Sequence, residues 1–173
     1  MKPIGTRMIV TSRLVLRRPQ QEDASALVKG GSLPMPLAQA VKSVAEMVAE
    51  SGKPFCFHWV ITLDGQVIGR VKGWEVSPYN GYLQLGYDLS PEYRGKGYMT
   101  EAVGAVIRYM LTEADANRVY CSVREGNMAS RRVCEKNGMR HEGVLRQHYA
   151  RQDGGFDDVY LYGIVRSDLQ KGD

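Results

Sequence analysis

A glycine-rich stretch followed directly by a helical pattern is the part of this sequence best suited to chemistry. Residues 85–100 read LGYDLSPEYRGKGYMT, in which Gly95 and Gly97 flank Lys96 and Arg94 precedes them. Glycines allow the backbone to turn so that successive N–H groups converge on one anion, and the following helix N-terminus adds the positive end of its dipole. The pattern therefore predicts a phosphate-binding loop, to which the two cationic side chains add charge.

Two familiar phosphate motifs do not fit this loop. The dinucleotide-binding fingerprint requires a third glycine where Thr100 stands, and the Walker loop requires Lys and then Ser or Thr where Tyr98 and Met99 stand. The segment behind the loop has apolar residues at spacings of three and four, which predicts a helix with one stripe for a core. We therefore expect a phosphate ligand held in a different way from either motif.

The composition is that of a single globular domain, residues 1–173, which is long enough to bury roughly 70% of its unfolded surface. No apolar run approaches 18 residues, so we expect no membrane-spanning helix. The first thirty residues contain Arg7, Arg13, Arg17 and Arg18, where a signal peptide would need an apolar centre. These features predict a cytoplasmic protein that does not bind membranes.

The cysteines and the net charge exclude several classes of site. Cys56, Cys121 and Cys134 are odd in number and form no CxxC pair, so neither a disulfide framework nor a zinc site is expected, and we predict no metal. A net charge of +4 and a pI near 9.0 suit an anionic ligand. Because no Lys/Arg run carries interleaved aromatics, we do not expect binding to nucleic acid.

The elements that would position the loop follow from the periodicity of the chain. Strands are predicted at 13–18, 55–62, 66–74, 82–89, 118–123, 139–149 and 156–165, and helices at 20–29, 37–50, 99–114 and 127–137. Because helix 99–114 provides a crossover, strand 118–123 should lie parallel to strand 82–89. The order β-α-α-β-β-β-α-β-α-β-β predicts an α/β (α+β) fold, with a mixed, mostly antiparallel sheet of about seven strands and about four flanking helices.

Five segments of the chain resemble the GNAT superfamily of acetyltransferases, and within it the RimJ/RimL-like group that acetylates protein N-termini and small amines. They are RLVLRRP near the start, LGYDLSPEYRGKGYMTEA in the middle, NMASRRVCEKNGM in the last predicted helix, and GVLRQHY with FDDVYLY at the end. This resemblance covers nearly the whole chain. It implies the GNAT fold and acetyl-CoA as co-substrate, with the loop at 93–98 holding its pyrophosphate.

The resemblance also implies where acetyl-CoA lies. In GNAT enzymes the pantetheine arm passes between two strands that splay apart, along the segment that corresponds to 87–89 here, and a backbone N–H near Leu89 would polarise the thioester carbonyl. Glu92 stands where the family usually has Gln or Arg, so we expect its side chain to face solvent. The implied cofactor-binding residues are Tyr87, Leu89, Arg94, Gly95, Lys96, Gly97, Tyr98, Met99, Asn127 and Ser130.

Candidates for stabilising the departing CoA thiolate share one face of the last predicted helix, where Asn127, Ser130 and Cys134 are spaced i, i+3, i+7. Many GNAT enzymes carry a tyrosine at the position of Cys134 as the proton donor, and RimL-like members use a serine at the position of Ser130. We therefore predict that Ser130 donates a hydrogen bond to the thiolate. Cys134, a thiol of ordinary pKa about 8.5, is the second catalytic candidate, with a buried structural thiol as the alternative.

The general base is not evident, because Gln84 stands where the resemblance implies a glutamate, and an amide cannot accept the amine's proton. An α-amine of pKa about 7.7–8.0 is already about a quarter neutral near pH 7.4, whereas lysine, near 10.4, is neutral in about one part in a thousand. The substitution thus favours α-amine acceptors. Gln84, His148 and Asp158 are predicted to lie on the acceptor side. Other groups that could act through water are Glu75, Asp88, His58 and Asp157.

The expected function is acetyl-CoA-dependent acetylation of a primary amine by direct attack, with an α-amine of a peptide or an aminoacyl-like compound as acceptor. One alternative is a non-catalytic acyl-CoA-binding or regulatory module, which Gln84 and Cys134 favour. Another is acetylation of an antibiotic or polyamine. Dimers are common in the family, so a homodimer that pairs across the closing hairpin is a further expectation.

Overall fold

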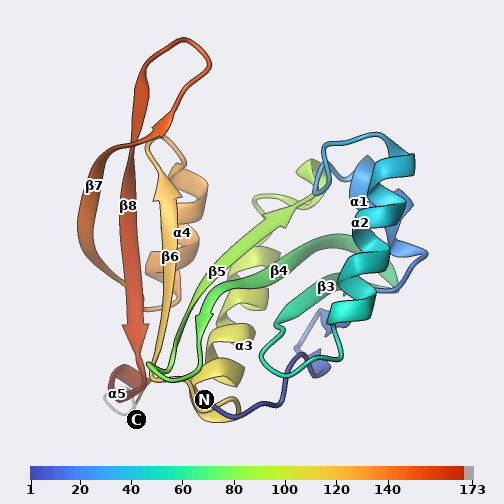
Figure 1. Cartoon of the computed structure of the whole chain (residues 1–173), viewed down its shortest axis with the longest axis horizontal. Coiled ribbons are helices and arrows are strands. Elements are labelled where there is room, and N and C mark those ends of the chain that lie inside the picture. The colour runs from blue at the N-terminus through green and yellow to red at the C-terminus, as the bar shows by residue number, and fades with distance from the viewer. Residues whose placement is uncertain (170–173) are drawn as a thin grey trace.

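One sheet of eight strands runs through the computed structural model, which describes residues 1–169 (Figure 1). The strands are β1 (Ile9–Val10), β2 (Val15–Arg17), β3 (His58–Leu63), β4 (Gln66–Ser77), β5 (Tyr82–Leu89), β6 (Arg118–Arg124), β7 (Arg140–Ala150) and β8 (Phe156–Val165). Across the sheet they follow the order β1-β2-β3-β4-β5-β6-β8-β7. All neighbouring pairs are antiparallel except β5 and β6, so the predicted parallel crossover is confirmed.

Helices cover both faces of this sheet. They are α1 (Asp23–Lys29), α2 (Leu37–Glu50), α3 (Tyr98–Thr112), α4 (Met128–Lys136) and the short α5 (Arg166–Leu169), with a 3-10 turn, η1 (Pro91–Tyr93), before α3. The apolar stripe of α3 is buried in the main core, as Val103 and Val106 show. α1 and α2 pack on each other in a smaller core that contains Leu27 and Val44. Figure 1 shows these two helices at the β3–β4 end and α4 beside β6.

The parallel pair is short, and the two strands then separate. β5 and β6 are paired from Tyr82 opposite Arg118 to Gln84 opposite Tyr120. Beyond that point β5 continues to Leu89 while pairing with β4 alone, and β6 continues while pairing with β8. Figure 1 shows the gap that opens between β5 and β6 towards the glycine loop. Beyond Gln84 and Tyr120 the two strands therefore share no backbone pairing.

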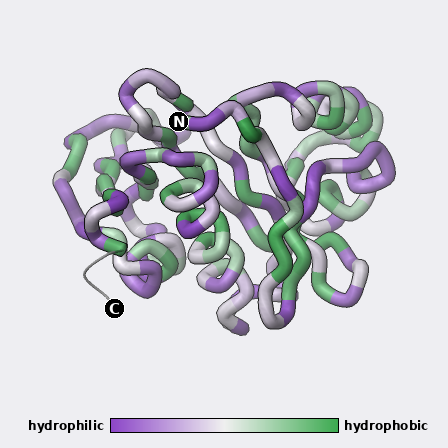
Figure 2. Tube along the Cα trace, turned by 90° about the horizontal axis from the view of Figure 1, so that it is seen from below, coloured by the Kyte–Doolittle hydropathy of each residue, from purple (hydrophilic) through white to green (hydrophobic). Residues whose placement is uncertain are grey.

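Most differences from the predicted elements lie at boundaries. Phe55 has a φ of 62°, so the strand expected from residue 55 begins at His58. The two-residue β1 and the four-residue α5 carry too little periodicity to be predicted from sequence. Figure 2 shows hydrophobic and hydrophilic stretches interspersed along the whole trace. Within residues 1–169 no helix has the length and apolar character needed to span a membrane.

Candidate active site

The glycine loop adopts the backbone conformation that its sequence predicts. Gly95 has a φ of 75° and Gly97 a φ of 83°, both in the left-handed region that a side chain makes costly. Gly97 is the N-cap residue of α3, so the first N–H groups of that helix lack intrahelical partners. Glu92 is exposed to solvent, as expected. The loop is thus shaped to receive an anion at the positive end of a helix dipole.

Arg13 holds this loop from a distant part of the chain. Its guanidinium donates to the backbone oxygen of Lys96 (3.0 Å) and to Glu101 (2.7 Å), and it stacks on the ring of Tyr98 at 4.5 Å. Burial opposes ionisation of Glu101, but hydrogen bonds from Thr11, Arg13 and neighbouring groups prevail and lower its pKa to about 2. The pair therefore ties the N-terminal segment to the first turn of α3.

A cavity of about 530 Å³ opens beside the loop, between β5, α3 and α4. It is lined by Tyr87, Asp88, Leu89, Tyr93, Arg94, Gly95, Gly97, Tyr98, Met99, Thr100, Asn127, Ala129, Ser130, Arg132, Val133 and Lys136. Nine of the residues predicted to bind the co-substrate belong to this set, whereas Lys96 lies outside it. Arg94, Arg132 and Lys136 give the wall three cationic side chains. The cavity is large enough for a ligand of many atoms and is electrostatically suited to phosphates.

Tyr87 joins β5 to α4 at the wall of this cavity. Its hydroxyl lies 2.8 Å from the Ser130 Oγ and 3.2 Å from the Ser130 backbone oxygen, and it is 3.5 Å from the Cys134 Sγ. Burial, together with the nearby thiols, raises the pKa of the Tyr87 phenol well above its ordinary value. The phenol therefore remains protonated at neutral pH and is available as a hydrogen-bond donor.

The start of α4 fixes the position of Ser130. The Asn127 side chain is the N-cap, because its Oδ1 accepts a hydrogen bond from the Ser130 N–H at 3.1 Å. Cys134, one turn further along, is fully buried at 0% exposure and lies outside the cavity lining. Contact with Cys121 lowers the pKa of the Cys134 thiol, and Tyr87 contributes in the same direction, although burial opposes both. Of the two predicted catalytic groups, Ser130 is the one that reaches the cavity.

The residues predicted for the acceptor side lie apart from this cavity. Gln84 is the last residue of β5 that pairs with β6. The carboxylate of Asp158 accepts a hydrogen bond from the backbone N–H of Gln147 at 2.7 Å, within the closing hairpin. His148 packs edge-on against Tyr149, with ring centroids 4.7 Å apart. His148 and Asp158 therefore lie on the closing hairpin, whereas Gln84 lies on β5.

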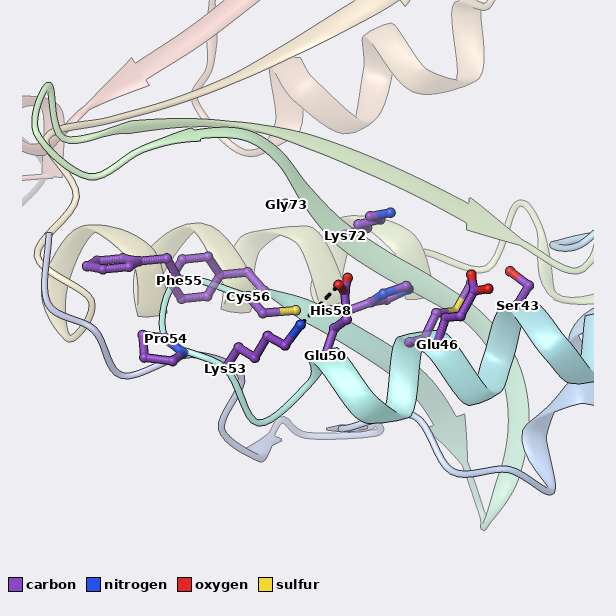
Figure 3. Close-up of a pocket in the computed structure, with 12 residues that line it drawn as sticks. Ser43, Glu46, Glu50, Lys53, Pro54, Phe55, Cys56, His58, Lys72 and Gly73 are labelled. Carbon is purple, nitrogen blue, oxygen red and sulfur yellow. Dashed lines mark hydrogen bonds and ion pairs between the residues drawn. The ribbon is translucent and has the colours of Figure 1, made fainter.

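A second cavity, of about 370 Å³, lies between α2 and the beginning of β3 (Figure 3). Figure 3 shows Glu46 and Glu50 on the helix, with Glu50 paired to Lys53 at 3.4 Å. His58 lies beneath them at 3% exposure, and its Nε2 has no hydrogen-bond partner within residues 1–169. Burial, then Lys72, lowers the pKa of His58 to about 3. Within residues 1–169 as a whole, no group of three or more His, Cys, Asp or Glu side chains is placed to hold a metal ion.

Comparison with known proteins identifies the family to which the glycine loop and its neighbouring cavity belong. The family model described as "Acetyltransferase (GNAT) domain" matches residues 13–140, which include the glycine loop and all of the cavity lining. The chain belongs to the GNAT family. Its sheet and helices have the arrangement of GNAT structures, and its homologues make it an N-acetyltransferase.

Three similar proteins illustrate the relationship. N-acetyltransferase YnaD of Bacillus subtilis is 31% identical over 92% of this chain and 98% of its own. The ribosomal-protein-serine acetyltransferase of Escherichia coli is 29% identical over 72% of this chain and 69% of its own. A solved structure of RimL, a ribosomal L7/L12 alpha-N-protein acetyltransferase, in complex with coenzyme A has a TM-score of 0.82, with 19% identity over 92% of this chain and 98% of that one.

Within this GNAT domain, sequence reasoning missed two residues of the cavity wall, the side-chain role of Tyr87, and the arginine that holds the glycine loop. Arg132 and Lys136 follow Ser130 on α4 and line the same wall, and their spacing of four residues on one helix could have indicated them. The hydroxyl of Tyr87 was missed because Tyr87 was considered for its backbone alone. Arg13 was missed because its partner, Glu101, is 88 residues away in the sequence.

Proposed function

We propose that this chain transfers the acetyl group of acetyl-CoA directly to a primary amine, and that the acceptor is the α-amine of a protein or peptide N-terminus or of an aminoacyl-like small molecule. The observation that carries the proposal is a single cavity that is lined both by the glycine loop and by the Tyr87–Ser130 hydroxyl pair. The glycine loop suits the binding of phosphates, and the hydroxyl pair offers hydrogen-bond donors to a leaving thiolate.

The residues present fit acetyl-CoA by their chemistry. Left-handed Gly95 and Gly97 form a cradle without side chains, and Arg94, Arg132 and Lys136 supply positive charge for three phosphate groups. When bound, acetyl-CoA supplies an acyl group that is activated as a thioester. In this proposal the backbone of β5 near Leu89 orients the thioester carbonyl, as a preorganised donor does in acyl transfer.

Ser130 and Tyr87 then act on the leaving group. The neutral amine nitrogen attacks the carbonyl carbon, the new C–N bond forms, the C–S bond breaks to release the CoA thiolate, and the nitrogen loses one proton, which finally reaches solvent. In this proposal the Ser130 hydroxyl donates a hydrogen bond to the thiolate. The Tyr87 hydroxyl, which stays protonated, donates a hydrogen bond to the Ser130 Oγ and so orients the serine hydroxyl. Cys134 is fully buried and does not line the cavity, so the proposal gives this role to Ser130.

Two considerations support an α-amine acceptor. At neutral pH an α-amine, of pKa about 7.7–8.0, is present in its neutral, attacking form far more often than lysine, of pKa about 10.4, so an α-amine depends less on any base. The E. coli relative is a ribosomal-protein-serine acetyltransferase, and RimL acts on an alpha-amino group of ribosomal L7/L12.

The test is release of free CoA thiol from acetyl-CoA in the presence of matched acceptors. A peptide with a free N-terminus and no lysine is compared with the same peptide N-terminally blocked and carrying one lysine, and a polyamine and an aminoglycoside complete the panel. We expect turnover with the free N-terminus alone. Turnover confined to the lysine peptide or polyamine would contradict the choice of acceptor. Binding of acetyl-CoA without turnover on any acceptor would favour the regulatory-module alternative.

A further inference from the structure

A strained residue lies at the closed end of the gap between β5 and β6. The pairing of β4 with β5 is regular up to Trp74 opposite Gln84, and its register then shifts before Ser77. Glu75, inside this bulge, has a φ of 42°, a conformation that side chains rarely adopt. Strain of this kind gathers at functional sites, where surrounding contacts maintain it.

The bulge directs the Glu75 carboxylate across β5 to β6. The Tyr120 hydroxyl donates a hydrogen bond to the Glu75 Oε2 at 2.5 Å. Tyr120 itself faces Gln84 in the last β5–β6 pair, so the carboxylate lies where the two strands begin to diverge. Burial and the neighbouring Glu75 raise the pKa of Tyr120, which keeps this phenol a donor.

The other acids considered as bases are engaged by stronger partners. Asp88 forms an ion pair with Arg70 at 2.7 Å, Asp157 lies near two arginines, and Asp158 accepts from a backbone N–H. Glu75 has the Tyr120 hydroxyl as its contact, and no salt bridge involves it in the described part of the chain. Arg118 lies over the Tyr120 ring but is paired with Glu142, and Lys72 lies over the Trp74 ring.

We propose that Glu75 is the general base of the acetyl transfer and supplies, from β4, the carboxylate that Gln84 lacks on β5. This inference rests on the proposed function. Glu75 takes the proton from the attacking amine nitrogen as the C–N bond forms, and Tyr120 holds the carboxylate in place. The proton then passes to water, because Glu75 is exposed, and the CoA thiolate is protonated from solvent.

The spacing along β5 is consistent with this role. A strand advances about 3.3 Å per residue, so the backbone positions of Gln84 and Tyr87 are about 10 Å apart along β5. In the proposal the amine and the thioester lie along this part of β5, between Glu75 and the Tyr87–Ser130 pair.

The test compares Glu75→Gln with the control Glu113→Gln, an exposed residue after α3, using an N-terminal peptide as acceptor. We expect Glu75→Gln to lower kcat at pH 7 by about 100-fold, as for loss of a general base, with unchanged acetyl-CoA affinity. The deficit should shrink at pH 9.5, where the acceptor amine is already neutral. Tyr120→Phe, which keeps the carboxylate, should cause a smaller loss, and Glu113→Gln none.

Each outcome separates the inference from the function on which it rests. If the wild type turns over and Glu75→Gln retains kcat within twofold at pH 7, Glu75 is not the base although the proposed function stands. An equal deficit at pH 7 and pH 9.5 would also overturn the inference, because it would show a structural role. A wild type that binds acetyl-CoA and never turns over would overturn both.

Discussion

Removal of one hydroxyl group, by Tyr87→Phe, tests how the CoA thiolate is stabilised. In the structure this hydroxyl contacts Ser130 Oγ at 2.8 Å, and Ser130 rather than Cys134 reaches the cavity. If Tyr87 orients Ser130, its loss should reduce the rate of the chemical step without changing the affinity for acetyl-CoA. The ring and its packing remain, so the fold should be retained.

The magnitudes follow from the type of hydrogen bond lost. A hydrogen bond between neutral groups contributes roughly 0.5–1.5 kcal/mol, and each 1.36 kcal/mol of activation free energy is tenfold in rate, so Tyr87→Phe should lower kcat about 2- to 13-fold. Ser130→Ala removes a hydrogen bond to a charged group, worth roughly 1.5–3 kcal/mol, and should lower kcat about 13- to 160-fold. The effect of Tyr87 is therefore the smaller one.

A double-mutant cycle, measured by single-turnover release of CoA thiol, decides the relation between the two residues. In the Ser130→Ala background, Tyr87→Phe should cause no further loss, because Tyr87 acts through Ser130. Equilibrium dialysis should give the same Kd for acetyl-CoA in all four proteins. Multiplicative losses would show that Tyr87 acts on the thiolate independently, and full activity of Tyr87→Phe would show that the contact is structural; either result refutes the reasoning.

Three further substitutions test the glycine loop and the lowered pKa values of Glu101 and His58. Gly97→Ala places a Cβ 3.4 Å from the Arg13 guanidinium at a φ of 83°, so it should cost roughly 1–2 kcal/mol and raise the KM for acetyl-CoA; an unchanged KM contradicts the role of the loop. Glu101→Gln should lower Tm at neutral pH, because the ionised Glu101 carboxylate, whose pKa is lowered in the folded state, stabilises the fold. The difference in Tm from wild type should vanish as pH falls from about 4.5 to about 2. A difference that does not depend on pH would contradict this role of the carboxylate. Between about pH 6.5 and 3 the unfolded chain binds a proton that folded His58 does not. His58→Leu should therefore flatten the loss of stability over that range in urea unfolding, and identical profiles would refute it.

Local sequence signals predicted the parts of the site that depend on neighbouring residues. The left-handed turns at Gly95 and Gly97 and the shared helix face of Asn127 and Ser130 follow from spacing alone, because a turn or a helix fixes the geometry of nearby residues. The parallel relation of β5 and β6 likewise followed from the length of the intervening helix.

Contacts between distant segments could not be predicted in this way. Tyr87 meets Ser130 across 43 residues, and Glu75 meets Tyr120 across 45. Each contact depends on the register of two strands or on where a helix packs. The bulge at Glu75 shifts the β4–β5 register, and no residue type at this position predicts that bulge. Sequence reasoning consequently named Glu75 as one of several acids without a means of choosing it.

The separation of β5 from β6 has a consequence for how the fold is completed. Two strands in the middle of a sheet each have one backbone edge without a strand partner, a situation that proteins normally confine to the outer edges of their sheets. The resemblance to GNAT enzymes implies that the pantetheine arm would lie along this seam, where its amides would take the place of a missing strand partner. The co-substrate would then be a structural component as well as a reactant, and its saturating presence, at 100 times Kd, would add roughly 2.7 kcal/mol to the stability of the whole domain.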